Sequence, residues 1–230
     1  MEIKKELGKQ HKDFRYLSDQ DIQKLRDVSV ARSYSKGQVL FDVDDDRSHV
    51  YFLVSGIIKL EKIDETGTFT YLHFKKAKSL LLYLDLFTDK KHYVSAVAYT
   101  DIEIISIPVK IFEEVVSNSA LQLITVIQEQ SKLLRTQIFK IQKGIINNAD
   151  CRVTATLAII YKDLGEKQYP SGTVIVSSPI TINDIARASG TTRETASIVI
   201  KKLVAAKKIK YSRKYLTFLD TSFFNDLLND

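Results

Sequence analysis

The N-terminal half of the chain alternates between apolar and polar residues in short runs. Examples are residues 37–41 (Gly-Gln-Val-Leu-Phe), 50–54 and 56–61, which turn glycines and acidic loops separate. Alternation with a period of two places every second side chain on the same face of a sheet. The pattern predicts about eight short strands over residues 32–108, preceded by a helix over residues 18–27. Strands of this size and spacing are typical of a small antiparallel β-roll or jelly roll.

The spacing of apolar residues changes to alternating threes and fours between Ser117 and Ile145. This spacing is that of a heptad repeat, whose a and d positions form one narrow seam along a helix. A long helix buries such a seam best against an identical helix, so we predict a parallel coiled-coil dimer interface. The seam consists of Ile124, Ile127, Ser131, Leu134, Ile138, Ile141 and Ile145.

A second apolar stripe runs along the same predicted helix. It contains Leu123, Val126 and Leu133, which can face the β-roll. The polar residue Ser131 in the seam weakens a coiled coil. Packing of the long helix within its own chain therefore stays open as the alternative to a dimer.

Residues 181–203 contain two short amphipathic patterns separated by Gly190. In the first, Thr181 and Asp184 have the spacing of a capping box, and Thr191 and Glu194 have the same spacing in the second. Gly190 readily adopts the positive φ that a tight turn requires. Two helices joined in this way are typical of a helix-turn-helix, whose second helix enters the major groove of DNA.

The second of these helices has two different faces. At about 100° per residue, its apolar face contains Ala196, Val199, Ile200, Leu203 and Ala206, and its opposite face is largely polar. Arginine can donate to O6 and N7 of guanine, and glutamate can accept from N4 of cytosine. Both halves of a G·C pair can thus be read from the first turn. The predicted base-reading residues are Arg193, Glu194, Ser197 and Ile198.

A β-hairpin is predicted over residues 208–219, where two strands flank the turn Ser212-Arg213-Lys214. A shorter strand pair around residues 173–176 follows a turn at residues 169–172. Together these elements predict a winged helix over about residues 149–230. A cationic hairpin tip can contact the DNA backbone. The predicted backbone contacts are Thr191, Thr192, Lys201, Arg213 and Lys214.

Positive charge is concentrated in the predicted winged helix. Residues 181–219 carry nine basic and two acidic side chains, whereas the rest of the chain carries 25 basic and 26 acidic ones. A local excess of this kind suits binding to phosphates, which should weaken steeply with salt. The 230 residues, 44% of them hydrophobic, suffice for two cores, so we expect domains at residues 1–148 and 149–230.

Few residues are suited to hold a metal or cofactor. The only cysteine, Cys151, excludes an internal disulfide, a four-cysteine zinc site and an iron–sulfur cluster held by this chain alone. His49, His73 and His92 are scattered and lack the spacing of a cupin metal site. We therefore expect no catalytic residue, no metal and no cofactor, and a core position for Cys151.

The sequence also predicts a cytoplasmic protein without a membrane segment. No run approaches the roughly 18 apolar residues of a membrane span. The first residues, Met-Glu-Ile-Lys-Lys-Glu-Leu, are charged where a signal peptide would be apolar.

The order β-roll, long helix and winged helix resembles the Crp/Fnr family of bacterial transcription regulators over nearly the whole chain. The most specific match is Gly-Thr-Thr-Arg-Glu-Thr at residues 190–195, which looks like the start of that family's recognition helix. The resemblance implies a homodimer on an inverted repeat in double-stranded DNA, and RNA polymerase as a partner if the protein is an activator. Arg193, Glu194 and Ser197 stand where family members contact bases. Ile198 stands where many carry arginine; an isoleucine can instead contact a thymine methyl.

The positions that bind cyclic AMP in some family members are substituted. Those members carry a glycine-rich stretch ending in a ribose-binding glutamate, and later an Arg-Ser pair that binds the phosphate. Without these groups a buried cyclic nucleotide would leave its charge unpaired, so the sequence predicts that cyclic AMP is not the ligand. The apolar stretch 80–87 resembles instead the branch with the Listeria virulence regulator and the halorespiration regulators. The substituted positions are Lys78, Leu82, Tyr83, Asp85 and Val94, the last directly before Ser95.

Two functions of other classes stay open. One is a β-roll metalloenzyme with an appended DNA-binding module, and the other is a ligand-binding dimer whose winged helix docks a protein partner. A joint at residues 144–148 is expected to transmit any switching from the β-roll to the recognition helices. The sequence does not distinguish an activator from a repressor.

Overall fold

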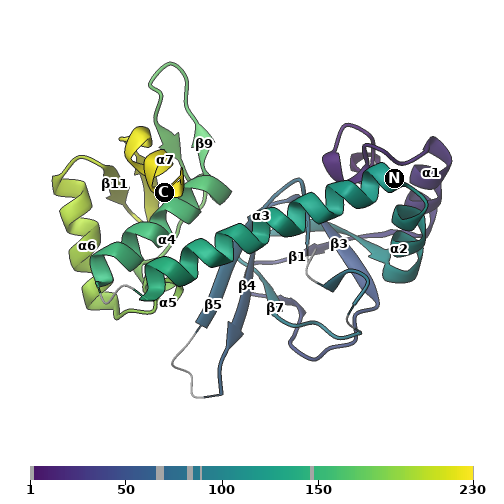
Figure 1. Cartoon of the computed structure of the whole chain (residues 1–230), viewed down its shortest axis with the longest axis horizontal. Helices are drawn as coiled ribbons and strands as arrows, with labels where there is room; N and C mark the ends of the chain where they lie inside the picture. Colours follow the sequence, from purple (N-terminus) through teal and green to yellow (C-terminus); the bar gives the residue numbers. More distant parts are fainter. Residues whose placement is uncertain (1–2, 66–69, 82–84, 89, 146–147, 230) are drawn as a thin grey trace. The chain divides into compact units, whose positions relative to one another are not determined.

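A computed structural model describes residues 3–65, 70–81, 85–88, 90–145 and 148–229 of the chain (Figure 1). The chain divides into two compact units. The first comprises residues 1–62 and 75–134, and the second comprises residues 63–74 and 135–230. The predicted joint at residues 144–148 includes Ile146 and Asn147, which lie outside the described residues.

Eight described strands form two four-stranded sheets in the N-terminal half (Figure 1). One sheet has the order β1-β8-β3-β6 and the other β2-β7-β4-β5. The described pairings are antiparallel, for example Val50 of β3 opposite Ile107 of β8. The predicted antiparallel β-roll is therefore confirmed. The strands are β1 (Val30–Tyr34), β2 (Val39–Phe41), β3 (His49–Ser55), β4 (Ile57–Ile63), β5 (Thr70–Lys76), β6 (Ser79–Leu80), β7 (Ser95–Ala98) and β8 (Ile102–Pro108).

Helices cover the core of this unit. The predicted helix is α1 (Asp19–Val28), and the Ser18 side chain caps it by accepting a hydrogen bond from the Asp21 N–H at 3.0 Å. A further helix, α2 (Val109–Ser117), was not predicted from the sequence. The buried core includes Phe14, Phe52, Ile105, Phe112 and Val126. Two short 3-10 helices, η1 (Ile3–Glu6) and η2 (Lys12–Phe14), precede α1.

The long helix α3 (Ala120–Ile145) begins three residues later than expected. The prediction from Ser117 was wrong because α2 ends there and a short break separates the two helices. Val126 is buried in the core and Leu123 packs against it, whereas Leu133 is only half-buried. The second stripe of the helix thus faces the β-roll at these two positions.

The C-terminal part has the order of a winged helix, as predicted (Figure 1). Its sheet runs β11-β12-β10-β9, and Phe218 packs edge to face with Tyr161 and Phe224 in its core. Cys151 is half-buried rather than enclosed, because it lies in the first turn of α4. The elements are α4 (Ala149–Leu164), β9 (Glu166–Lys167), β10 (Val174–Ile175), α5 (Ile182–Ala188), α6 (Arg193–Ala205), β11 (Ile209–Ser212), β12 (Tyr215–Phe218) and α7 (Thr221–Asn229). Across the described chain, the helices are either too short or too polar to span a bilayer.

Candidate nucleic-acid interface

The first helix of the helix-turn-helix begins with the predicted capping box. The Thr181 hydroxyl accepts a hydrogen bond from the Asp184 N–H at 3.1 Å, and the Asp184 carboxylate accepts one from the Thr181 N–H at 3.2 Å. This reciprocal pair satisfies backbone donors that the start of a helix leaves without partners. The start of α5 is therefore fixed by its own sequence.

The second helix begins one residue later than predicted. Thr192, not Thr191, is the N-cap of α6, and its hydroxyl accepts a hydrogen bond from the Thr195 N–H at 3.2 Å. The N–H of Thr191 instead donates to the Ala186 carbonyl at 3.0 Å, which holds Thr191 in the turn. Gly190 has φ +57°, as the tight turn requires. Two adjacent threonines are equally suited to cap a helix, and the geometry of the turn decides between them.

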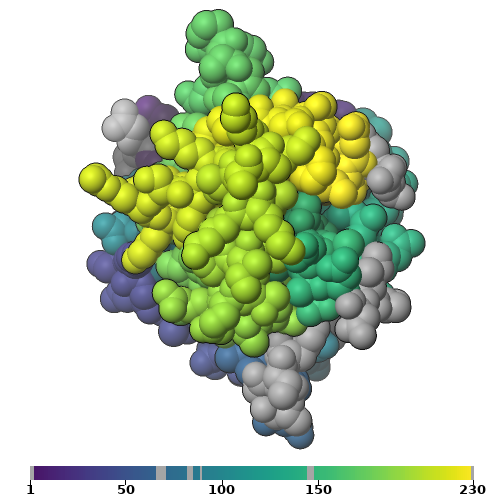
Figure 2. Space-filling model, turned by 90° about the vertical axis from the view of Figure 1, so that its left-hand side faces the viewer, coloured from purple at the N-terminus to yellow at the C-terminus, as the bar shows by residue number. Residues whose placement is uncertain are grey.

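The apolar and polar faces of α6 lie largely where the helical periodicity of the sequence predicts them. Ala196, Val199 and Ile200 are buried, whereas Leu203 is half-buried. Ala206 was wrongly assigned to the packing face: it is the C-cap residue and is exposed, because the helix ends before it. On the other face Arg193, Glu194, Ile198 and Lys201 are exposed and Ser197 is half-exposed. In Figure 2 the yellow-green residues of α6 lie at the front of the view.

The wing is a tight hairpin with two cations at its tip. Ser212 of β11 pairs with Tyr215 of β12, so Arg213 and Lys214 alone form the loop. Both residues have positive φ, +50° and +73°, a conformation that matches the twist of a hairpin but disfavours side chains other than glycine. The backbone strain falls on Arg213 and Lys214, which are both exposed cations. Strain that the fold retains at two such residues indicates that their positions at the tip serve a function.

Hydrogen bonds tie the wing to the segment that leads into α5. The Ile180 N–H donates to the Lys214 carbonyl at 2.7 Å, and the Tyr211 hydroxyl donates to the Ile180 carbonyl at 2.8 Å. Burial raises the pKa of Tyr211, which favours the protonated, donating form of this hydroxyl. The wing tip and the start of the helix-turn-helix are therefore held together by contacts that the sequence did not reveal.

Arg152 of α4 fixes the turn between α5 and α6. Its Nε donates to the Ser189 carbonyl at 3.1 Å and its Nη2 to the Gly190 carbonyl at 3.3 Å. This role is not evident from the sequence, because 37 residues separate Arg152 from Ser189. No local pattern signals such a contact.

Not all of the nine basic side chains counted in the sequence remain available. Lys202 forms a salt bridge with Asp150 at 2.7 Å, and Lys208 forms one with Asp220 at 2.6 Å. Within the described part of the chain, six others are exposed and outside any salt bridge. These six are Arg193, Lys201, Lys207, Lys210, Arg213 and Lys214. The winged helix therefore presents an excess of positive charge, but fewer cations are available than the sequence count gives.

The predicted seam on α3 is exposed along the described helix. Ile127, Leu134 and Ile141 are 59%, 62% and 61% exposed, and Ile124 and Ile138 are about half exposed. Ser131 is also exposed and donates to the Ile127 carbonyl within its own helix. Leu121, which the heptad count omitted, extends the exposed apolar surface by one turn. The side chain of Ile145 is not described.

The substituted ligand positions of the β-roll are partly described. Lys78 has φ +60°, the left-handed conformation that glycine adopts readily, and Val94 and Asp85 are buried. The Ser95 hydroxyl donates to the Asp42 carboxylate, which lowers the pKa of Asp42. Leu82 and Tyr83 lie outside the described residues. Among the residues that are described, no three His, Cys, Asp or Glu side chains form a cluster that could hold a metal.

Comparisons with known proteins agree with this architecture. Residues 31–119 match the family model of the cyclic nucleotide-binding domain. The HTH-type transcriptional regulator ArcR of Staphylococcus epidermidis is 28% identical over 196 residues, and the match covers 82% of each chain. The listeriolysin regulatory protein of Listeria monocytogenes is 26% identical over 199 residues, covering 82% of this chain and 81% of that one. The structure of FixK2 from Bradyrhizobium japonicum has a TM-score of 0.72 at 17% identity, covering 87% of this chain and 97% of that one.

These matches agree on a fold with a cyclic nucleotide-binding type of β-roll and a C-terminal helix-turn-helix domain, and the two named relatives are regulators. The chain is thus similar to proteins of the Crp/Fnr family, in agreement with what the resemblance of its sequence predicted. The Listeria regulator named in that prediction is among the similar proteins. Both relatives are named as regulators rather than as enzymes.

Proposed function

We propose that this protein is a sequence-specific, DNA-binding transcription regulator that acts as a homodimer on an inverted repeat. In this proposal residues 1–148 form the effector-type domain and residues 149–230 bind DNA. The observation that carries it is the surface formed by α6 and the wing, where exposed cations lie both on the second helix of the helix-turn-helix and at the tip of the hairpin that follows it. The similarity of the chain to proteins named as regulators supports the same function.

Base recognition is assigned to the first turns of α6. Arg193 and Glu194 are exposed, and among the described residues neither forms a salt bridge, so their polar groups can pair with base edges. Ser197 adds a hydroxyl one turn further along the helix. Ile198, 55% exposed, adds an apolar contact for a thymine methyl.

Backbone contacts are assigned to both ends of this surface. Thr191 and Thr192 lie at the N-terminus of α6, where backbone N–H groups attract phosphate. Lys201 is exposed on α6, and Arg213 and Lys214 form the wing tip. These contacts fix the register of the protein on DNA without reading its sequence.

The homodimer is assigned to the seam on α3. Exposed isoleucines and leucines at heptad spacing cost free energy in water, and an identical helix would cover them. A two-fold dimer places its recognition helices in successive major grooves, about 34 Å apart.

Cyclic AMP remains excluded as effector in this proposal. Ser95 is the residue that would have contacted the phosphate. Its hydroxyl instead donates a hydrogen bond to the Asp42 carboxylate. A phosphate at this position would face a carboxylate, and like charges repel. Any effector in the β-roll must therefore be of another chemical class.

Selection of bound sequences from a randomised DNA pool tests the proposal. The full chain should enrich inverted repeats whose half-sites are about one helical turn apart, each with a G·C pair at a fixed position. The logarithm of the binding constant should fall linearly and steeply with the logarithm of salt concentration. Failure to enrich any palindrome at low salt, or binding that is insensitive to salt, would contradict it.

A further inference from the structure

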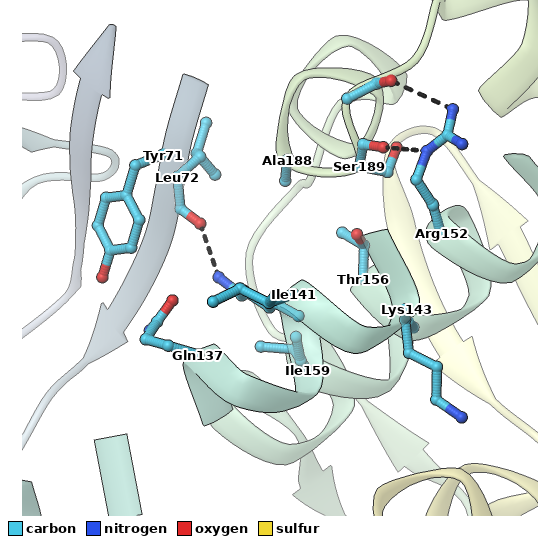
Figure 3. A pocket seen from close by; sticks show the side chains of 13 residues that line it. Tyr71, Leu72, Gln137, Ile141, Lys143, Arg152, Thr156, Ile159, Ala188 and Ser189 are labelled. Atoms are coloured by element: carbon cyan, nitrogen blue, oxygen red, sulfur yellow. Dashed lines mark hydrogen bonds between the residues drawn. The ribbon is translucent and has the colours of Figure 1, made fainter. Parts of the chain in front are cut away.

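A cavity of about 470 Å³ lies within the second unit (Figure 3). All of its lining residues belong to this unit and come from β5, α3, α4 and the end of α5 with the turn that follows. Much of the wall is apolar, including Ile141, Ala155 and Ile159. Its volume falls in the range of about 300–1,000 Å³ that small-molecule sites occupy.

The charged side chains that line the cavity are all basic. They are Lys140, Lys143 and Arg152, and no acidic residue belongs to the lining. Arg152 holds the turn after α5, and Lys143 extends away from the other labelled side chains in Figure 3. Lys140 is therefore the cation best placed to meet a ligand. Asp163, which acts electrostatically on Lys140, does not line this cavity but shares with Lys140 the wall of a much smaller neighbouring one.

Two donors at the wall lack a full set of acceptors. The Lys140 ammonium has three N–H groups, and its described hydrogen bond is to the Leu72 carbonyl at 3.2 Å. The amide nitrogen of Gln137 is buried and has no hydrogen-bond partner among the described residues. Burial lowers the pKa of Lys140 to about 8, as expected for an ammonium that is poorly solvated. An anionic acceptor would pair with both groups at once.

We propose that this cavity binds a small organic carboxylate with an apolar body, and that its occupancy changes the affinity of α6 for DNA. A single negative charge suits one inward lysine, and an apolar body suits the remaining wall. The wall includes Ala188 at the end of α5 and Ser189 and Gly190 of the turn that leads into α6. Regulation rests on the proposed function, whereas binding of the carboxylate does not.

The test is calorimetric titration of the full chain, without DNA, with butyrate, octanoate, 3-phenylpropionate and indole-3-propionate, and with the amide of each. At least one carboxylate should bind about tenfold tighter than its amide, since a hydrogen bond to a charged group is the stronger one. The substitution Lys140→Met should remove this preference, and Gln137→Leu should reduce it. Lys110→Met, at an exposed position of α2, should leave it unchanged.

Three results would overturn the site: no binding by any carboxylate, equal binding of acid and amide, or an unchanged preference in both cavity variants. Because the acid–amide comparison uses the unaltered chain, a variant that fails to fold does not remove the test. Regulation is measured separately, as a change of about fivefold or more in DNA affinity at saturating carboxylate. Binding without such a change would overturn the regulatory part alone, and DNA binding itself is judged by the selection experiment above.

Discussion

At the scale of single residues, the proposed function assigns different contributions to DNA binding to the outward face of α6 and to the wing tip. Arg193 presents a guanidinium whose fork matches the two acceptors of guanine, whereas Lys214 presents a point charge. The first can discriminate between sequences and the second cannot. Substitutions at the two positions should therefore have different signatures.

Arg193→Ala should cost about 1–3 kcal/mol of discrimination at one G·C pair, because two hydrogen bonds to guanine are lost. The measurement is the affinity of the variant and the unaltered protein for operators that carry each base at that position. Lys110→Ala serves as the control, since Lys110 is exposed on α2. Discrimination that survives the substitution would show that another residue reads this pair.

Lys214→Gly should stabilise the fold by about 1 kcal/mol while weakening DNA binding, because glycine relieves the positive φ and removes a phosphate contact. Affinity should fall similarly for all sequences, and the salt slope should decrease by about one. Lys214→Ala is the matched control: it removes the charge but keeps the strain. Equal stability of the two variants, measured by urea denaturation, would refute the strain at this turn.

Lys140 should make stability depend on pH above neutrality. Burial lowers its pKa from 10.5 to about 8, so between these values the unfolded chain holds a proton that the folded chain has released. Stability from this group must therefore rise with pH across that window. The free energy of unfolding, relative to Lys140→Met, should increase by roughly 3 kcal/mol between about pH 7.5 and pH 10.5. Parallel pH profiles of the two proteins would contradict the shift.

At the scale of elements, the periodic patterns predicted most strands and helices, and local ambiguities account for the errors. The β-roll strands, α1 and the wing follow from alternation and turn residues. Helix α2 was missed because its short apolar run continues that of β8, so periodicity alone gives no boundary at Pro108. The start of α6 was misplaced because neighbouring threonines can both act as caps.

The features of the candidate interface likewise fall into two groups, those that local sequence patterns predict and those that depend on tertiary contacts. The exposure of Arg193, Glu194 and the wing cations follows from helical and hairpin periodicity, which the sequence contains. The role of Arg152 and the tie between Tyr211 and Ile180 depend on contacts across many residues. The pairing of Lys202 and Lys208 with acidic partners is also tertiary. Such contacts leave no trace in local spacing.

The corrected cap of α6 can be tested with two neighbouring alanine variants. Thr192→Ala should destabilise the protein by about 1 kcal/mol, since it removes the acceptor for the Thr195 N–H. Thr191→Ala should cost less, because Thr191 enters the turn through its backbone N–H. Urea denaturation of both variants measures the difference. A larger loss for Thr191→Ala would restore the cap predicted from the sequence.

At the scale of the whole molecule, the central question is the assembly of two chains. The seam on α3 is exposed from Ile124 to Ile141, whereas Val126 on the other stripe is already buried in the β-roll core. One stripe of the helix thus packs within its own chain, whereas the other is the stripe proposed to bind a second chain. Since the proposed operator is an inverted repeat, DNA affinity should depend on the seam even though no seam residue is among the proposed DNA contacts.

Leu134→Glu should convert the proposed dimer to monomers, because it places a charge on each helix at a core position of the coiled coil. Sedimentation velocity measures the assembly, and affinity for the full inverted repeat should drop by about tenfold or more, while weak binding to one half-site persists. Lys110→Glu, at an exposed position of α2 away from the seam, is the control. A dimer that survives Leu134→Glu would place the interface elsewhere.

Because the two faces of α6 are separate, its packing residues and its outward-facing residues can change independently during evolution. Ala196, Val199 and Ile200 anchor the helix, and they share no position with Arg193, Glu194 or Ile198. If the outer side reads bases as proposed, a point mutation there changes the DNA sequence that is bound without an accompanying penalty in folding. Under the proposed function, the set of genes that the protein controls can change through single substitutions while its fold stays the same.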